Sequence, residues 1–347
     1  MRSRIVTSLS ADDRRRFLRA GIGIAALTAG AANWPAVSAL AGDLEMFIKG
    51  PPVPDIKPEQ LSEHVWMIYS KDGFPTPENQ GMMANIVFAA TAKGVVMLDS
   101  GGSLQIGEMA IRQIRSITDK PVVAIFVSHY HGDHWLANHA FVNAYGADLP
   151  IHAHPVTTRE IQGVQGNLWR DLMERWTNQA TAGTRIVAPN RDVEHGAEFD
   201  FGDVTIRIHH YGTAHTPGDI CMEVVEDRLM YVGDVAMDRR IANMDDGSYV
   251  GTFKYMDELE RNAPASLWVP GHGHAGPKVL QWNRELFEGI YENCLKAVEE
   301  SLGMAEAREM VMNDPRVSSR ASETLGFESN IGKYVSLAYL EAESEAF

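Results

Sequence analysis

The chain of 347 residues is long enough for one large domain or two small ones. Its 45% hydrophobic and 22% charged residues are typical of a soluble globular protein. The formal net charge of −15 argues against a nucleic-acid partner, which would require a basic face, and makes a polyanionic substrate a poor match. The two cysteines, Cys221 and Cys294, are too few for a zinc ribbon or a disulfide framework, and we expect two buried free thiols rather than one bridge.

The first 41 residues have the pattern of an export signal. Residues 13–19, Asp-Arg-Arg-Arg-Phe-Leu-Arg, resemble the twin-arginine signal, and an apolar Gly/Ala-rich stretch too short for a membrane span follows at 20–32. Residues 39–41, Ala-Leu-Ala, offer a cleavage site after Ala39 or Ala41. We expect twin-arginine export to the periplasm with loss of residues 1–41. Retention as an uncleaved anchor is the alternative. No later apolar run is long enough to span a bilayer, so we expect no stable membrane insertion after cleavage.

The remaining chain alternates between segments typical of strands and of helices. Residues 42–60 contain four prolines and predict an extended lead-in. Strands are predicted at 64–69, 84–89, 94–99, 121–127, 149–154, 199–211, 220–232 and 266–269. Helices are predicted at 104–118, 135–145 and 157–180, and from about 278 to the C-terminus.

This order favours an α/β fold in which helices lie outside packed sheets. We find no linker and no repeat of fixed period in the chain after the signal. We therefore predict one domain over residues 61–280 and a helical extension over 281–347 that packs on the same domain.

Four potential metal ligands lie within six residues directly after a predicted strand: His129, His131, Asp133 and His134. Alternation along an extended segment would place His129, His131 and Asp133 on one side. His134 follows where a helix begins. Imidazole and carboxylate are ligands that Zn²⁺ selects, whereas a structural zinc site more often uses cysteine. The cluster is also too crowded for one tetrahedral ion.

Three later segments supply matching ligands. Each places a histidine or aspartate near a strand end beside glycine, which allows a sharp turn. They are residues 213–219 with His215, residues 232–234 with Asp234, and residues 270–273 with His272. These partners make a histidine-rich surface turn a poor explanation for the first cluster.

The complete series, His-x-His-x-Asp-His, then His, Gly-Asp and Pro-Gly-His, resembles the metallo-β-lactamase superfamily over residues 62–275. The resemblance implies a four-layer αββα sandwich with two metal sites. One site would use His129, His131 and His215, the other Asp133, His134 and His272, and Asp234 would bridge them. Asp99 matches an early aspartate of the family that supports the ligand loop, and His272 is preferred over His274 because it directly follows Pro-Gly.

The resemblance further implies a metallo-hydrolase with two Zn²⁺ per chain, with iron or manganese as alternatives. A metal-bridging hydroxide would attack a small carbonyl substrate: a β-lactam, thioester, lactone or ester. Asp133 is also the candidate to orient the nucleophile or to accept its proton. Residues 329–335 are similar to a segment of periplasmic zinc metallo-hydrolases associated with quinoprotein and sulfur oxidation, which implies no defined substrate.

Two other functions are compatible with these residues. A mononuclear iron persulfide dioxygenase would retain His129, His131, His215 and Asp234 and leave the second site empty. A periplasmic accessory protein would keep the metal site without turnover.

The loop around Phe74 and the helix that carries Trp169, Met173 and Trp176 are candidate walls of a substrate cleft, with packing in the core as the alternative. The sequence leaves the oligomeric state and the physiological substrate open.

Overall fold

The computed structural model describes residues 49–241 and 244–346. The predicted export signal lies outside the described residues. Residues 51–347 form one compact unit, to which all elements named below belong. None of the helices in the described part of the chain combines the length and apolarity needed to cross a bilayer.

The first half of this unit contributes a sheet of seven strands in chain order. The strands are β1 (Glu59–Gln60), β2 (Val65–Ile68), β3 (Ile86–Thr91), β4 (Gly94–Leu98), β5 (Val122–Phe126), β6 (Ile151–Ala153) and β7 (Arg191–Asp192). Strands β1 to β4 pair antiparallel and β4 to β7 pair parallel. Parallel pairs need crossover connections. The connecting helices are α3 (Leu104–Ile117), α4 (Gly132–Trp135), α5 (Asn138–Tyr145), α6 (Pro155–Gln162) and α7 (Val164–Trp176).

The second half contributes a five-stranded sheet in the order β12-β11-β10-β9-β8. Its strands are β8 (Glu198–Asp200), β9 (Thr205–His209), β10 (Cys221–Val224), β11 (Leu229–Gly233) and β12 (Leu267–Pro270). Strands β8 to β11 are antiparallel, whereas β12 runs parallel to β11 after the crossover helix α8 (Tyr249–Asn262). The helices α9 (Val279–Glu299), α10 (Met304–Asn313), α11 (Pro315–Ser318) and α12 (Phe327–Ala346) follow, with a 3₁₀ turn at Ala321–Glu323.

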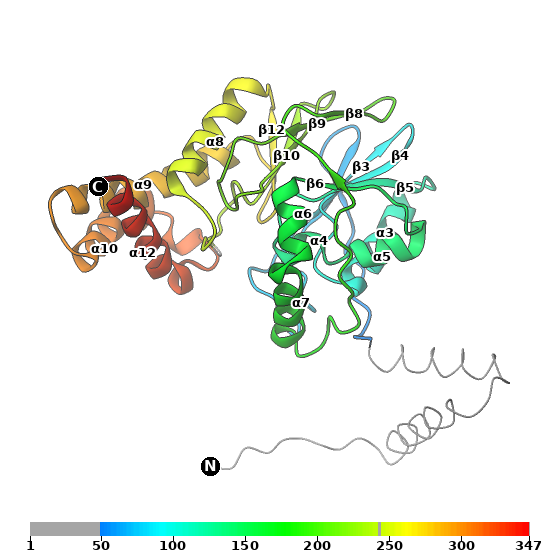
Figure 1. The fold of residues 1–347 in the computed structure, drawn as a ribbon, viewed down its shortest axis with the longest axis horizontal. Helices are drawn as coiled ribbons and strands as arrows, with labels where there is room; N and C mark the ends of the chain where they lie inside the picture. Colours follow the sequence, from blue (N-terminus) through cyan, green and yellow to red (C-terminus); the bar gives the residue numbers. More distant parts are fainter. Residues whose placement is uncertain (1–48, 242–243, 347) are drawn as a thin grey trace, which may run out of the picture. The chain divides into compact units, whose positions relative to one another are not determined.

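The burial pattern of the strands produces four layers. Alternate residues of a strand face opposite sides: Val87 of β3 lies in the core between the two sheets with Ile208 and Met222, whereas Phe88 faces helices α3 and α5. On the outer face of the second sheet, Met230 packs in a core with Tyr255 of α8. The αββα sandwich expected from the sequence is therefore present (Figure 1).

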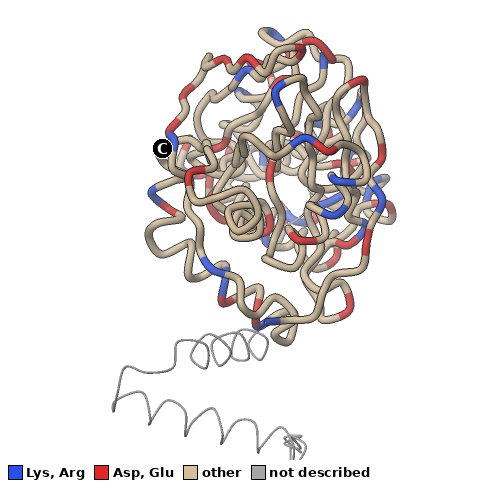
Figure 2. The backbone as a smooth tube through the Cα atoms, turned by 90° about the vertical axis from the view of Figure 1, so that its right-hand side faces the viewer, with Lys and Arg blue, Asp and Glu red and all other residues tan. Residues whose placement is uncertain are grey.

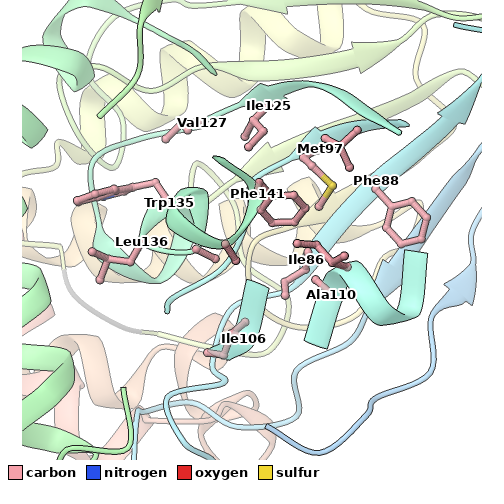
Figure 3. Close-up of a cluster of buried hydrophobic side chains, with 14 of the residues drawn as sticks. Ile86, Phe88, Met97, Ile106, Ala110, Ile125, Val127, Trp135, Leu136 and Phe141 are labelled. Atoms are coloured by element: carbon pink, nitrogen blue, oxygen red, sulfur yellow. The ribbon is translucent and has the colours of Figure 1, made fainter. Parts of the chain in front are cut away.

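Helix α3 shows how local sequence serves this packing. Ser103 caps its N-terminus by accepting a hydrogen bond from the backbone N–H of Ile106. Its apolar face lies against the first sheet, with Ile106 and Ala110 beside Ile86, Phe141 and Met97 (Figure 3). Each buried large aliphatic or aromatic side chain contributes about 1.5–3 kcal/mol to folding.

The C-terminal helices share their own apolar core. Leu286 and Ile290 of α9 pack with Tyr334 and Val335 of α12. Cys294 is buried in this cluster, and Cys221 is buried in the second sheet. Both thiols are free, as predicted. Basic and acidic residues are interspersed along the chain (Figure 2), and many form exposed ion pairs such as Arg316 with Glu292.

Several predicted elements are divided in the structure. The helix expected at 157–180 is broken at Gly163, whose backbone is not helical (φ −88°, ψ −133°), and becomes α6 and α7. The segment 220–232 is two strands, because Arg228 adopts a left-handed conformation (φ 49°) in the turn between β10 and β11. Likewise, 199–211 contains β8 and β9. Helix α8 was not predicted from the sequence, although its buried residues have helical spacing: Tyr249, Thr252, Tyr255, Met256 and Leu259.

Candidate metal centre

The predicted ligands lie in loops at the ends of strands. His129 and His131 follow β5, Asp234 follows β11, and His272 follows β12. His215 lies in the loop between β9 and β10. Backbone hydrogen bonds hold these loops together, since the N–H of Gly271 donates to Gly233 O at 2.7 Å and the N–H of Ile220 donates to Ser128 O at 2.9 Å. Both sheets therefore contribute ligands to one place.

All seven predicted metal ligands converge. Their side chains form three overlapping groups in which the ligand atoms lie within 4.8 Å of one another: His129 with His131 and His215, His129 with His134 and Asp234, and Asp133 with His134 and His272. Each of the seven residues is at most 8% exposed. The two ligand sets expected from the sequence are thus brought together in one buried cluster.

Asp234 lies between the two ligand sets. Its Oδ1 is 3.5 Å from His134 Nε2. Its Oδ2 is 3.5 Å from His215 Nε2 and 3.3 Å from His272 Nε2. Within the sets, His131 Nδ1 lies 2.9 Å from His215 Nε2, and Asp133 Oδ2 lies 3.2 Å from His272 Nε2. This is the position that a carboxylate shared by two ions requires.

The backbone conformation at Asp133 differs from the prediction. The backbone is extended at His131 (φ −70°, ψ 137°), but α4 begins at Gly132, so Asp133 lies in the first turn of a helix rather than on an extended segment. Strand alternation was therefore the wrong reason for its position. The turn into the helix brings Asp133 and His134 toward His272.

The polar atoms at the centre fit divalent cations. Four of them are buried without a hydrogen-bond partner in the described structure: His129 Nε2, Asp133 Oδ2, His134 Nε2 and Asp234 Oδ1. Burying such atoms unpaired costs about 1–3 kcal/mol each, which metal coordination would offset. Nitrogen and carboxylate oxygen donors match Zn²⁺. Gly271 keeps the space open, because a Cβ there would lie 2.3 Å from Asp234 Oδ1.

The charges around the centre also favour a bound cation. Burial, together with the nearby imidazoles, lowers the pKa of His129 and brings that of His215 to about 3, so both rings are neutral. Burial alone would raise the pKa of Asp234, but His272 and His134 lower it well below its usual range. Burial would lower the pKa of His134, but Asp133, Asp234 and Asp99 raise it well above its usual range. Surrounding carboxylates thus favour positive charge here.

Asp99 organises the first ligand loop, as predicted. It is fully buried at the end of β4 with φ 65°. Its Oδ2 pairs with His134 Nδ1 at 2.7 Å and accepts hydrogen bonds from the hydroxyls of Tyr231 at 2.7 Å and Ser128 at 2.6 Å. Its Oδ1 accepts from the backbone N–H of Ser128 at 2.7 Å. A carboxylate at the far nitrogen of a ligating histidine fixes the orientation of the ring.

Three other residues beside the ligands were missed from the sequence. Asp246 Oδ2 lies 3.4 Å from His131 Nε2. Asp219 Oδ2 accepts backbone N–H bonds from residues 214–216 and so fixes the loop of His215. Arg240 Nη1 lies 2.6 Å from His272 Nδ1. Asp219 belongs to the Thr-Ala-His-Thr-Pro-Gly-Asp segment and was recognisable there, but Asp246 and Arg240 carry no local signal.

A cavity of about 500 Å³ opens over the cluster. Phe74 and residues of helix α7 line it, together with Arg240 and residues of α12. Trp169 and Trp176 contribute to its wall, as considered from the sequence, whereas Met173 is 1% exposed and belongs to the core. His274, the alternative to His272, stacks on Tyr69 at 4.2 Å and belongs to none of the three ligand groups.

Comparison with known proteins agrees with this fold. The family model of the metallo-beta-lactamase superfamily matches residues 80–304, and the chain belongs to this superfamily. Among curated relatives, the type 2 metallo-beta-lactamase of Bacillus sp. (strain 170) is 20% identical over 225 residues, covering 64% of this chain and 77% of the relative. That of Bacillus cereus is 22% identical over 227 residues, covering 64% of this chain and 78% of the relative.

Solved structures show the same fold. The metallo-beta-lactamase from Pontibacter korlensis aligns with a TM-score of 0.52 at 18% identity, covering 67% of this chain and 98% of that one. A double mutant of the sec-alkyl sulfatase PisA1 aligns with a TM-score of 0.58 at 15% identity, covering 73% of this chain and 45% of that one. Members of the superfamily act on small molecules, and this chain carries their His/Asp metal-binding groups.

Proposed function

We propose that the protein is a zinc-dependent hydrolase of a small carbonyl substrate: a β-lactam, thioester, lactone or ester. The observation that carries the proposal is the convergence of two ligand sets on one buried space, with four ligand atoms left without hydrogen-bond partners. The sequence contains no motif typical of a serine or cysteine nucleophile. The metal centre would therefore have to supply the nucleophile for hydrolysis.

His129, His131 and His215 would hold one ion, and Asp133, His134 and His272 the other, with Asp234 in contact with both. When bound, the ions would polarise the substrate carbonyl and lower the pKa of a water molecule toward neutrality. One water is consumed: its oxygen bonds to the carbonyl carbon, the bond to the leaving group breaks, and the leaving group takes a proton. We assign Asp133 to orient the water or accept its proton, since its Oδ2 faces the centre.

The activity is tested with a panel of a chromogenic cephalosporin, thioesters, lactones and aryl esters, each with and without a chelator. Turnover that is lost with chelator and restored by Zn²⁺ supports a metallo-hydrolase. Turnover of persulfides by protein that contains one iron would instead support the dioxygenase. Metal-loaded protein without turnover on any substrate would favour an accessory role.

We further propose export to the periplasm by the twin-arginine route, on the basis of Arg14, Arg15, Phe17 and Leu18. Exchange of both Arg14 and Arg15 for lysine should leave the protein in the cytoplasm, whereas the wild type should appear in the periplasm beginning after Ala39 or Ala41. Fractionation with N-terminal sequencing measures both. Equal export of the two forms would refute the proposal.

A further inference from the structure

A line of aromatic rings leads from the candidate metal centre to the outer rim of the cleft. The ring of His131 lies 4.8 Å from Trp169 of α7. Trp169 lies 6.2 Å from Trp176, and Trp176 lies 4.9 Å from Phe74. These centroid distances are those of contacting aromatic rings. All four residues line the same cavity, so one wall is aromatic along the length from the ligand to the rim.

Aliphatic side chains extend this wall into solvent. Leu168 and Leu172, one turn apart on α7, also line the cavity. Phe74 is 53% exposed and Leu168 is 45% exposed, although the core of the protein is close by. A contiguous exposed apolar surface inside a cleft is typical of a binding site, whereas single exposed apolar residues are ordinary. We define the apolar wall as Phe74, Leu168, Trp169, Leu172 and Trp176.

Polar and charged residues also line the cleft. Asn330 and Lys333 of α12 and Asp245 line it, and Lys333 Nζ lies 2.6 Å from Asp245 Oδ2. The Arg240 guanidinium lies deeper, beside His272. An apolar group placed against Lys333 and Asp245 would remove these exposed charges from water, and their ion pair offsets only part of that cost. The cleft lining therefore combines the apolar wall with a group of polar residues.

We propose that the substrate carries an apolar acyl or aryl group of several carbons, which packs along the apolar wall from Trp169 toward Phe74. The proposal rests on the proposed hydrolysis, because it places the carbonyl at the metal centre and the apolar group beside α7. It adds a substrate class, since a small polar acyl group would leave the wall exposed to water.

A series of aryl esters with acetyl, butyryl, hexanoyl and octanoyl groups tests the proposal on the zinc-loaded full chain. We expect kcat/KM to rise by about twofold to fourfold per methylene up to the length of the wall. The variants Leu168→Ser and Trp176→Ala should flatten this dependence. Val164→Ser is the matched control, since Val164 is on the same helix and 78% exposed but does not line the cavity, and it should keep the wild-type dependence.

A binding measurement separates this proposal from the hydrolysis on which it rests. Tryptophan fluorescence reports binding of butyrate, hexanoate, octanoate and decanoate. Affinity that grows with chain length in the wild type and in Val164→Ser, but not in the wall variants, supports the apolar wall even if no ester is hydrolysed. Two outcomes overturn the wall: ester hydrolysis that is indifferent to chain length, or a chain-length dependence that survives both wall variants. If ester hydrolysis is indifferent to chain length, the proposed hydrolysis still stands.

Discussion

At the scale of single residues, the site depends on groups that hold the ligands as well as on the ligands. Asp99 gathers His134, Tyr231 and Ser128 around one buried carboxylate. Its role was predictable because Asp99 ends a predicted strand and matches a family position. Asp246 and Arg240 were not predictable, because they reach His131 and His272 only after chain segments distant in sequence have packed together.

Replacement of Asp99 by alanine should therefore weaken both the fold and metal binding. It would leave several buried donors unpaired, each costing about 1–3 kcal/mol. It should also lower zinc affinity by about 10-fold to 100-fold, the usual effect of losing a carboxylate behind a ligating histidine. Urea unfolding and zinc titration measure the two effects.

Asp148→Ala is the control, because Asp148 is an exposed carboxylate and its loss should change stability by less than about 0.5 kcal/mol. Equal stability and zinc affinity in Asp99→Ala and Asp148→Ala would mean that Asp99 does not organise the ligand loop.

At the scale of elements, a side-chain contact joins the first sheet to the second. His64 precedes β2, and Asp227 lies in the turn between β10 and β11. His64 Nδ1 lies 2.7 Å from Asp227 Oδ1, and the backbone N–H of His64 donates to Asp227 Oδ2 at 2.9 Å. Burial lowers the pKa of His64, but the hydrogen bond and charge of Asp227 outweigh it and raise the pKa above 6.5.

This contact predicts a pH-dependent contribution to stability. Because the pKa of folded His64 is raised, its stabilisation is complete below the unfolded pKa of about 6.5 and is lost as pH rises through the folded value. The pKa of Asp227 is lowered despite its burial, so its own contribution is lost only in strong acid. His64→Gln should thus destabilise the protein more at about pH 5.5 than at about pH 8.5.

Unfolding free energies of the wild type and His64→Gln at both pH values measure this difference. The same exchange at His195, which is exposed and has a lowered pKa, controls for the general effect of losing a histidine. A loss of stability in His64→Gln that is the same at both pH values would contradict the contact.

Some helices and strands were predicted from the sequence and others were missed, for physical reasons. Helix α3 was found because its buried residues have helical spacing, and strands such as β3 and β4 were found because they are short apolar runs. The break at Gly163 was missed because one glycine within a helical pattern is not decisive. Helix α8 was missed although its buried residues have helical spacing, and it completes the crossover that aligns β12 with β11.

At the scale of the whole molecule, the candidate metal centre connects both sheets. Its ligands extend from His129 to His272, and the loops that carry them meet only in the folded chain. The sequence indicates these seven residues because each lies in a short motif near a strand end, and their role as metal ligands stays a prediction. The sequence did not predict that Asn330 and Lys333 of α12 line the cleft, because the similarity of residues 329–335 to other metallo-hydrolases does not say which cavity these residues reach.

We propose that these seven side chains hold two ions, and the metal content of the purified chain tests this proposal most directly. Elemental analysis after dialysis should find about two zinc ions per wild-type chain. His131→Ala should lose at least one of them, whereas His195→Ala, outside the site, should keep both. Wild-type protein that retains no metal when supplied with zinc, or His131→Ala protein that still retains two ions, would contradict the account.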